Sequence, residues 1–589
     1  MKNDTYAKTI DKETIEDFKK VFEQYSNKPN FWVSSEKDTY NELRRVFNRR
    51  FDFIPSLILQ PFTTEHVAAI VAYVTKHDLQ ITVKSGGHDH EGESVATGKI
   101  LIDFSEMNKT ETSLPDYNRD GVRFRQIRIQ PGARFLSIKK ELDKEHLGIP
   151  HGTCQSVAIA GYSMGGGWGP WTRKYGMGCE RLKGATIVLG NGVVKYLGTS
   201  VFYNKGLANE ENSEEFDSKL LWAIRGGGGL SYGIITEFFY EPFELPDIAT
   251  SFHISKELLP VFKKIKATAV IEAWEKVTAP GKYPQLIGTN LKVVAKPLDV
   301  LEEASKDAVL DWVMNGHFGG SRNELLELII EWGKYLVELQ LADIDFKANE
   351  QTDMFDSVIE GLKSNFDEAA NSSNVLTFAR GESNGYPYTF ESWDRYSSTA
   401  KEKGLSLETD CPAPHKITSR MPTENWDKLS REQLVCSLQS SLLKGIENTN
   451  ISSYITLGAI HGDYYGAPLT RKISALSCAF PYQTRPFTIQ YQTWWDMPTQ
   501  STPECGCKMD EHTLERVLPT RFNVNRALDW MEECRDYQIN ETHGSFISFK
   551  DASIPTKNYF AQNYDELMRI KLKYSGDKKN LFQSRKTII

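Results

Sequence analysis

Apolar and polar positions follow two alternating patterns in the first part of this 589-residue chain. Helical spacing of apolar residues over 63–77 and 135–146 predicts two amphipathic helices. Short runs rich in β-branched residues predict strands at 58–60, 80–84, 100–104 and 122–130. Short strands mixed with single helices indicate an α+β domain.

The clearest single element is the helix expected after Pro61. Thr63 offers a hydroxyl to cap the first turn, and Glu65 places an acid at the positive end of the helix. Further along, the β-branched run 185–189 is followed by Gly190-Asn191-Gly192, a turn sequence typical of a hairpin.

The character of the chain changes beyond Pro246. Three charged segments are expected to be helical, at 256–278, 299–316 and 322–346. Two aromatic-rich segments are expected to be strands, at 451–461 and 485–495, and a last helix is expected to end near Tyr574. These shifts divide the chain into a helical N-terminal extension (1–50), a first domain (51–245), a second domain (246–539) and a closing segment (540–589).

Composition narrows the class of protein. The formal net charge is −8 and no long basic run occurs, so neither nucleic acid nor a membrane surface is an expected partner. The charged start, Met1–Lys20, has no apolar signal core, and no stretch reaches the roughly 18 apolar residues of a membrane span. We therefore expect a cytoplasmic protein. Eight cysteines are scattered, with Cys505 and Cys507 the only close pair, so neither a disulfide framework nor a metal site is expected.

Two glycine-dense segments carry the candidate chemistry. Ser85–Asp89 places His88 behind two glycines, and Gly152–Cys154 places a thiol ahead of the glycine run Gly165–Gly169. Adjacent glycines let backbone N–H groups approach a ligand closely, and such groups can bind a pyrophosphate. Taken alone, each segment is better explained by a tight turn that carries a surface histidine or an ordinary buried thiol.

The segment Gly161–Gly165 also matches the G-x-S-x-G nucleophile elbow around Ser163. A hydrolase elbow needs a helix directly after its turn, whereas here Gly165–Gly169 and Pro170 follow and oppose a helix. We therefore favour a planar ligand packed against the glycine run. The chain has no G-x-G-x-x-G, so a Rossmann dinucleotide site is not indicated.

These segments together resemble the berberine-bridge-enzyme-like FAD-linked oxidases of the vanillyl-alcohol-oxidase superfamily. The resemblance also includes Leu59–Asp103, Arg173–Gly176, Trp222–Gly229, Tyr559–Tyr564 and Lys571–Phe582. It covers about 50–245 and 540–589 and is loose between them, apart from Phe480–Tyr482 and Ile489–Tyr491. It implies an α+β fold with a PCMH-type FAD-binding domain. It also implies a substrate domain whose central antiparallel sheet is backed by helices.

The resemblance implies an FAD held by two covalent bonds, from His88 to the 8α-methyl group and from Cys154 to C6 of the ring. It places Val157 where a small residue goes with access of O2, and Lys84 where many members carry Arg. The other residues that it places at the cofactor are Ser85, Gly86, Gly87, Asp89, Gly92, Ser94, Gly152, Gly161, Gly165, Gly166, Trp168, Gly169, Gly229, Gly233, Ile234, Tyr559 and Asn563.

The family that these motifs resemble carries its catalytic base at one of two positions, and this chain has no such base at either. Members use a Tyr in the strand before the closing segment, where Phe549 stands, or a Glu before the Phe-Pro motif, where the chain has Ser477 and no carboxylate. Neither side chain serves as a general base in ordinary conditions. The replacement candidates are His461, Asp463, Tyr464, Tyr465 and Tyr482. Simple packing of these residues, or a substrate that needs no base, are the alternatives.

The activity implied is that of an oxidase. A hydride would pass from an organic substrate to flavin N5 and then to O2, giving hydrogen peroxide. The expected substrate is an alcohol or a ring-closure intermediate of specialised metabolism. The alternatives are a carbohydrate oxidase, a flavin dehydrogenase with another electron acceptor, and a non-catalytic binding protein on the same scaffold.

Overall fold

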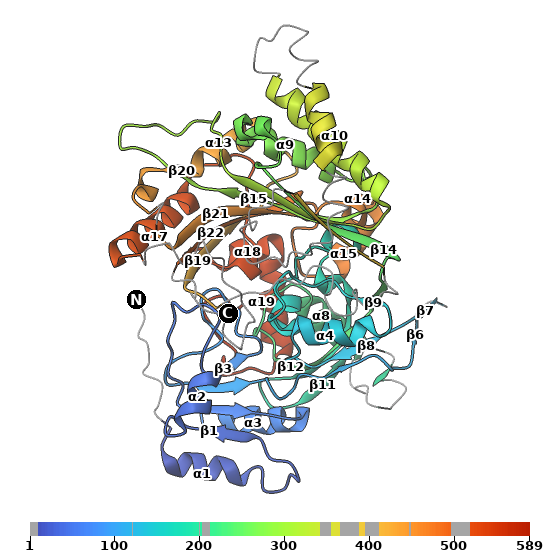
Figure 1. The fold of residues 1–589 in the computed structure, drawn as a ribbon. Coiled ribbons are helices and arrows are strands. Elements are labelled where there is room, and N and C mark those ends of the chain that lie inside the picture. The colour runs from blue at the N-terminus through green and yellow to red at the C-terminus, as the bar shows by residue number, and fades with distance from the viewer. Residues whose placement is uncertain are drawn as a thin grey trace.

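The fold is taken from a computed structural model, which describes residues 10–119, 122–199, 201–202, 206, 213–341, 355–365, 388–394, 412–446, 449–495 and 519–588. Figure 1 shows two layers of structure: a large sheet with helices above it, and a mixed region of smaller sheets and helices below it. The α+β class expected from the sequence is confirmed.

The four-stranded sheet of the lower region has the order β1 (Asn30–Trp32), β2 (Leu57–Gln60), β4 (Ile100–Asp103), β3 (Ile81–Lys84). Strands β2, β4 and β3 run parallel, and β1 runs antiparallel to β2 at the edge. Helices α1 (Lys12–Lys20) and α3 (Thr64–Lys76) share a hydrophobic core with this sheet. The expected cap of α3 is present, because Thr63 Oγ1 accepts a hydrogen bond from the His66 amide.

The N-terminal segment differs from the helical extension expected for 1–50. It contains α1 and α2 (Lys37–Leu43), but also the strand β1. The physical reason is that β1 completes the sheet: the Trp32 indole Nε1 donates to Gln60 Oε1 on β2 at 2.6 Å. This segment is therefore part of the lower region.

The second lower sheet has the order β11 (Val194–Leu197), β10 (Leu182–Val188), β12 (Ile234–Tyr240), β8 (Ile127–Ile129), β5 (Thr110–Glu111). The predicted hairpin is confirmed, because β10 and β11 pair antiparallel around the glycine turn. The single strand expected at 122–130 is divided into β7 (Val122–Phe124), which pairs with β6 (Tyr117–Arg119), and β8. Helices α4 (Phe135–Asp143), α8 (Ser213–Ile224) and α19 (Tyr564–Tyr574) pack around this sheet.

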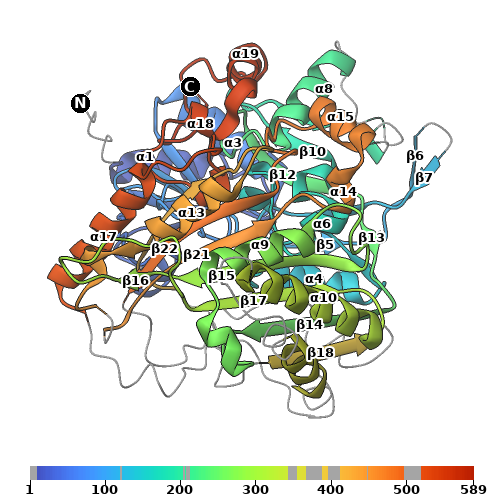
Figure 2. The same cartoon turned by 90° about the horizontal axis from the view of Figure 1, so that it is seen from above.

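The large sheet has seven strands, all antiparallel: β18 (Tyr388–Asp394), β14 (Ile248–Ser255), β17 (Trp312–Phe318), β15 (Leu286–Val294), β21 (Ile451–Ala459), β22 (Phe487–Trp495), β19 (His415–Arg420). Helices α9 (Ala267–Thr278), α10 (Arg322–Leu341) and α13 (Lys428–Ser437) cover one face, as Figures 1 and 2 show, and α17 (Arg521–Asp536) packs beside β22. The other face is turned toward the lower region.

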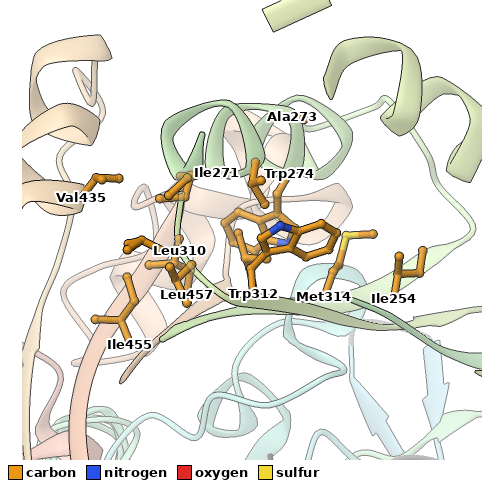
Figure 3. Close-up of a cluster of buried hydrophobic side chains, with 14 of the residues drawn as sticks. Ile254, Ile271, Ala273, Trp274, Leu310, Trp312, Met314, Val435, Ile455 and Leu457 are labelled. Carbon is orange, nitrogen blue, oxygen red and sulfur yellow. The ribbon is translucent and has the colours of Figure 1, made fainter. Parts of the chain in front are cut away.

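A cluster of large side chains fills the space between this sheet and its helices (Figure 3). Trp274 of α9 and Trp332 of α10 are fully buried, and the Trp332 ring meets Trp312 of β17 edge-on at 5.6 Å. Burial of aromatic surface is the main stabilising term of such a core.

One predicted helix is wrong. The segment 299–316 contains no helix, and its end forms strand β17. Burial alternates along β17, which places Trp312, Met314 and Phe318 in the core and is the signature of a strand covered on one face. The helix expected at 256–278 begins later, at Ala267, because Pro260 opens a separate 3-10 turn, Pro260–Lys264.

The closing segment returns to the lower region, with Phe582 and Ile588 buried in its two cores. Shorter elements are β9 (Leu147–Gly148), α5 (Ile159–Met164), α6 (Thr172–Tyr175), β13 (Phe243–Glu244), β16 (Lys296–Pro297), β20 (Gln439–Ser440), α14 (Asp463–Gly466), α15 (Pro468–Ser477) and α18 (Lys557–Phe560). In the described ranges, no helix has the length and apolar character that crossing a bilayer requires. Cys505 and Cys507 lie outside the described residues.

Candidate active site

The loop after β3 carries His88. Lys84 ends the strand and is held inward, with its Nζ 3.0 Å from Asp103 Oδ2 on β4. Gly87 then has φ +72°, which glycine adopts readily. A Cβ at Gly86 would lie 2.8 Å from the Ala158 amide nitrogen, so the absence of a side chain there lets this loop meet the loop after Cys154.

The His88 imidazole is fixed from two sides. Its Nε2 lies 2.8 Å from Ser156 Oγ, two residues beyond Cys154. On the other side, the Phe47 ring stacks on the imidazole with centroids 4.0 Å apart. The structure therefore brings the His88 and Cys154 loops side by side, although they are 66 residues apart in the sequence.

The Cys154 loop is anchored at its start by His151. The Trp171 indole Nε1 can only donate, so His151 Nε2 accepts at 2.9 Å, and His151 Nδ1 donates to the Gly152 carbonyl at 2.7 Å. Burial lowers the pKa of His151 to about 3, so this imidazole is neutral. Cys154 itself is half-buried, and Val157 is half-buried against the core around α4.

A buried ion-pair network holds the residues after His88. Asp89 accepts from the amides of Glu91 at 2.9 Å and Glu93 at 3.1 Å, and its Oδ2 lies 2.6 Å from Lys550 Nζ. Burial alone would raise the pKa of Asp89, but Lys550 and the Glu93 amide outweigh it and lower that pKa. Lys416 of β19 binds Glu91 at 2.8 Å and Asp551 at 2.6 Å.

The glycine run passes between the two layers. Gly166 and Gly167 have φ +106° and +81°, and the Trp168 indole Nε1 donates to the Ala459 carbonyl of β21 at 2.9 Å. A Cβ at Gly169 would lie 1.8 Å from the His151 carbonyl oxygen, so this glycine permits the run to lie directly on the start of the Cys154 loop.

Ser163 is not an exposed nucleophile. It lies within α5, it is fully buried, and its hydroxyl donates to the Ile159 carbonyl at 2.7 Å. A Cβ at Gly161, on the same helix, would meet no atom within 4 Å outside that helix. A hydrolase elbow is thus absent at this motif.

Two of the three tyrosines predicted as candidate bases are held as donors. Tyr465 OH donates to Glu180 Oε1 at 2.8 Å, and burial together with Glu180 raises its pKa well above the usual value. Tyr482 OH donates to the Asn558 carbonyl, and burial raises its pKa to about 12. Burial also raises the pKa of Tyr464. These shifts disfavour the phenolate that would accept a proton.

The other two candidates are His461 and Asp463, which lie just before Tyr464 and Tyr465 in the chain. Burial, with Arg471 nearby, lowers the pKa of His461, and Asp463 Oδ1 lies 3.9 Å from the buried Arg173. Among the described residues, Cys179, Glu180 and Cys478 form a group with ligand atoms within 4.8 Å of one another. Glu180 already accepts hydrogen bonds from Tyr465, Ser474 and Cys478, so its oxygens serve the core.

At the two positions where the similar family carries its catalytic base, the structure places side chains that make only packing or local contacts. Phe549 lies in a 3-10 turn, Ile547–Phe549, where a strand was expected. Its ring meets Trp168 at 6.5 Å and His90 at 6.4 Å. Ser477 ends α15, and its hydroxyl donates to the Ser474 carbonyl at 3.4 Å.

Several residues predicted at the cofactor make structural contacts. Gly233 packs tightly on Ile187, Ile234 opens β12, and a Cβ at Gly229 would lie 3.5 Å from the Met164 methyl group. Tyr559 OH donates to the Asp551 carbonyl at 2.9 Å, and Asn563 Nδ2 donates to the Ala479 carbonyl at 2.9 Å. These contacts leave a role at the cofactor a prediction.

Sequence reasoning missed four side chains around His88: Phe47, His90, His415 and Lys550. His90 carried a usable signal, since it lies two residues beyond His88 in the same motif. The others come from distant parts of the chain, and no local pattern links them to the loop.

The residues present fit a flavin. Ser94 Oγ, on the His88 loop, and Ser548 Oγ, against Gly165, are buried and make no hydrogen bond within the described part of the chain. Buried hydroxyl groups without partners are unfavourable unless a ligand satisfies them. Together with an imidazole and a thiol on adjoining loops, they suit a polar, planar ligand that can be attached covalently.

Comparisons with known proteins show which families and folds this chain is similar to. Residues 55–198 match the family model for the FAD binding domain, and residues 545–589 match the model "Berberine and berberine like". The solved structure of glucooligosaccharide oxidase from Acremonium strictum superposes with a TM-score of 0.62 at 18% identity, covering 95% of this chain and 97% of that one. The fold is therefore that of the PCMH-type FAD-linked oxidases.

Curated relatives show which proteins the sequence is similar to. FAD-linked oxidoreductase dpmaF of Metarhizium anisopliae is 33% identical over 35% of this chain and 36% of its own length. Berberine bridge enzyme-like 12 of Arabidopsis thaliana is 29% identical over 91% of this chain and 84% of its own length. The first three curated relatives are matched over 36%, 38% and 39% of their lengths. The chain is thus similar to the berberine-bridge-enzyme-like FAD-linked oxidases over both matched segments, 55–198 and 545–589.

Proposed function

We propose that this protein is an FAD-dependent oxidase whose flavin is bound covalently by both His88 and Cys154. The observation that carries the proposal is the contact between their loops, with His88 Nε2 2.8 Å from Ser156 Oγ and Gly86 against Ala158. One flavin ring can be reached from two adjoining loops more readily than from two separated ones. The structural relative glucooligosaccharide oxidase carries a 6-S-cysteinyl, 8α-N1-histidyl FAD, which is the same pair of residue types.

The flavin would supply a two-electron acceptor that takes a hydride from carbon. The chain's own residues would fix it. His88 is oriented by Phe47 and Ser156, and the loop beyond it is held by Asp89 and Lys550. Val157, three residues beyond Cys154, has a small side chain. This size is consistent with access of O2 and with release of hydrogen peroxide.

The aromatic character of the surroundings supports one substrate class. Trp168, Phe549 and Trp494 contribute to two hydrophobic clusters that adjoin the His88 side of the large sheet. Such surfaces favour a flat apolar alcohol or ring-closure intermediate of specialised metabolism. Carbohydrate oxidation is the second candidate, since it is the activity named for glucooligosaccharide oxidase.

The test is peroxide release from the purified protein in air with coniferyl alcohol, an aromatic alcohol, and with cellobiose, a sugar. The proposal expects peroxide from the aromatic alcohol at the higher rate. Peroxide from cellobiose alone would move the function to the carbohydrate oxidases. Bleaching of the flavin without oxygen, followed by slow reoxidation in air, would identify a dehydrogenase.

A further inference from the structure

A pair of histidines lies beside the loop that carries His88. His90 Nδ1 is 3.0 Å from Nε2 of His415, the first residue of β19. The His415 side chain is fully buried, and its ring lies 3.8 Å from the ring of Trp494 on β22. The pair joins the His88 loop to an edge strand of the large sheet.

The hydrogen bonds define where the protons lie. His415 Nδ1 is 2.9 Å from the Ala413 carbonyl oxygen, which can only accept, so this nitrogen carries a hydrogen. Nε2 of a neutral His415 then has a lone pair and accepts from Nδ1–H of His90. With the donors and acceptors arranged in this way, Nε2 of His90 is the nitrogen of the pair that takes up a proton.

Asn48 holds the two histidines in register. Its Nδ2 donates to the carbonyl of His90 at 2.7 Å and to that of His415 at 3.0 Å. Its Oδ1 accepts from the His415 amide at 3.1 Å. Because Asn48 is fully buried, it fixes the backbone of both histidines, and the hydrogen bond between the rings then sets their relative orientation.

His90 also lies next to the position where the family's base is missing. Its ring centroid is 6.4 Å from that of Phe549, which in turn contacts Trp168 of the glycine run. Phe549 cannot accept a proton, whereas an imidazole two residues from His88 can do so near neutral pH.

Charged groups of both signs surround the pair. Asp89, adjacent to His90, interacts with it electrostatically. The cations on the surrounding elements are already paired: Arg50 with Glu91 at 3.3 Å, Lys416 with Glu91 at 2.8 Å, and Lys550 with Asp89 at 2.6 Å. Their repulsion of an imidazolium is therefore partly cancelled.

We propose that His90, positioned by His415, is the proton acceptor of the oxidation. This inference rests on the proposed function. The alcohol O–H bond breaks and its proton goes to His90 Nε2. The carbinol C–H bond breaks, its hydrogen and electron pair go to the oxidised flavin, and a C=O bond forms. His415 accepts a share of the new charge through the Nδ1–H of His90. O2, the acceptor of the proposed function, takes the two electrons and two protons as hydrogen peroxide.

The test uses the full-length flavin-loaded protein and three variants: His90→Gln, His415→Gln and, as a matched control, His77→Gln at the exposed end of α3. Glutamine keeps a hydrogen-bonding group but takes no proton. Anaerobic flavin reduction by coniferyl alcohol or cellobiose is followed from pH 5 to 9. We expect His90→Gln to retain bound FAD and to reduce it at least about 100-fold more slowly at pH 7. His415→Gln should shift the pH profile, and His77→Gln should match the parent protein.

A second measurement needs no substrate. The absorption spectrum of the oxidised flavin is recorded across the same pH range. We expect a titration between pH 5 and 8 in the parent protein that is absent from His90→Gln. An unchanged reduction rate in His90→Gln, or a parent spectrum without that titration, overturns the inference. A parent protein that carries no FAD instead defeats the proposed function, which is a separate and visible result.

Discussion

Single residues set the protonation and shape of the Cys154 loop. His151 shows this most clearly, because the Trp171 indole N–H occupies its Nε2 and the Gly152 carbonyl occupies its Nδ1. Burial disfavours a charged His151, and an added proton would also have to displace the indole. The loop that carries the thiol is thus built on a neutral imidazole.

A pH dependence of stability follows. Burial lowers the pKa of His151 to about 3 in the folded state, whereas the unfolded value is about 6.5. The unfolded chain therefore binds more protons between these values, and stability falls as the pH falls below 6.5. We expect this residue to lower the free energy of unfolding by about 2 kcal/mol between pH 7 and pH 5.

The check is chemical denaturation at both pH values for the parent protein and for His151→Gln, whose amide oxygen can still accept from Trp171. The difference in stability between pH 7 and pH 5 should be smaller in the variant. An equal difference in both proteins would contradict the assignment.

The sequence located His88 and Cys154 because both lie in local glycine motifs. It did not locate Phe47 or His415, which reach the same loop only through the tertiary fold. It also offered Tyr465 and Tyr482 among its candidate bases, because a sequence does not show that a phenol is buried and donates its hydrogen to a fixed acceptor.

At the scale of elements, the glycine run allows close approach between segments. Gly169 lies on the His151 carbonyl, whereas Gly161 on α5 has open space around it. Glycine is thus required at the first position by a backbone contact and not at the second.

A matched pair of substitutions tests this. Gly169→Ala would place a Cβ 1.8 Å from the His151 oxygen, so the backbone must shift; we expect a loss of at least about 2 kcal/mol of stability. Gly161→Ala, inside a helix, should be neutral or stabilise by up to about 1 kcal/mol. Thermal unfolding measures the stability of both variants. Equal melting temperatures would contradict the packing argument.

Elements were predictable where local chemistry decides them. The cap of α3 and the Gly190–Gly192 hairpin turn depend on neighbouring residues, and both are present. The segment 299–316 was not predictable in this way, because its charges suggested a helix while Trp312 and Met314 pair into the large sheet. Sheet pairing is a long-range effect, and it overrides local propensity.

At the scale of the molecule, one ion-pair network joins the two layers. Lys416, on the large sheet, binds Glu91 of the His88 loop and Asp551 of the closing segment, with side chains exposed by 8%, 3% and 1%. Asp551 is also held by Arg535 at 3.4 Å. The return of the closing segment to the lower region is thus tied to the His88 loop.

Removing Lys416 should be costly. Lys416→Met removes the cation shared by the buried carboxylates of Glu91 and Asp551 and leaves them the longer contacts with Arg50 at 3.3 Å and Arg535 at 3.4 Å. We expect a loss of about 3 kcal/mol of stability together with lower flavin content. Lys19→Met, which breaks an exposed pair with Glu16, is the control and should cost less than about 1 kcal/mol. Urea unfolding and the ratio of flavin to protein absorbance provide the two readings. A Lys416→Met protein as stable as the control would show that the network does not join the layers.

The central claim, that His88 and Cys154 both hold the flavin, is tested most directly by intact mass after denaturation in acid. The account predicts a protein heavier by one FAD. His88→Ala and Cys154→Ala should each keep the added mass through the remaining bond, and only the double variant should lose it. A parent protein at its bare sequence mass, or a single variant that releases all of its flavin, would contradict the account.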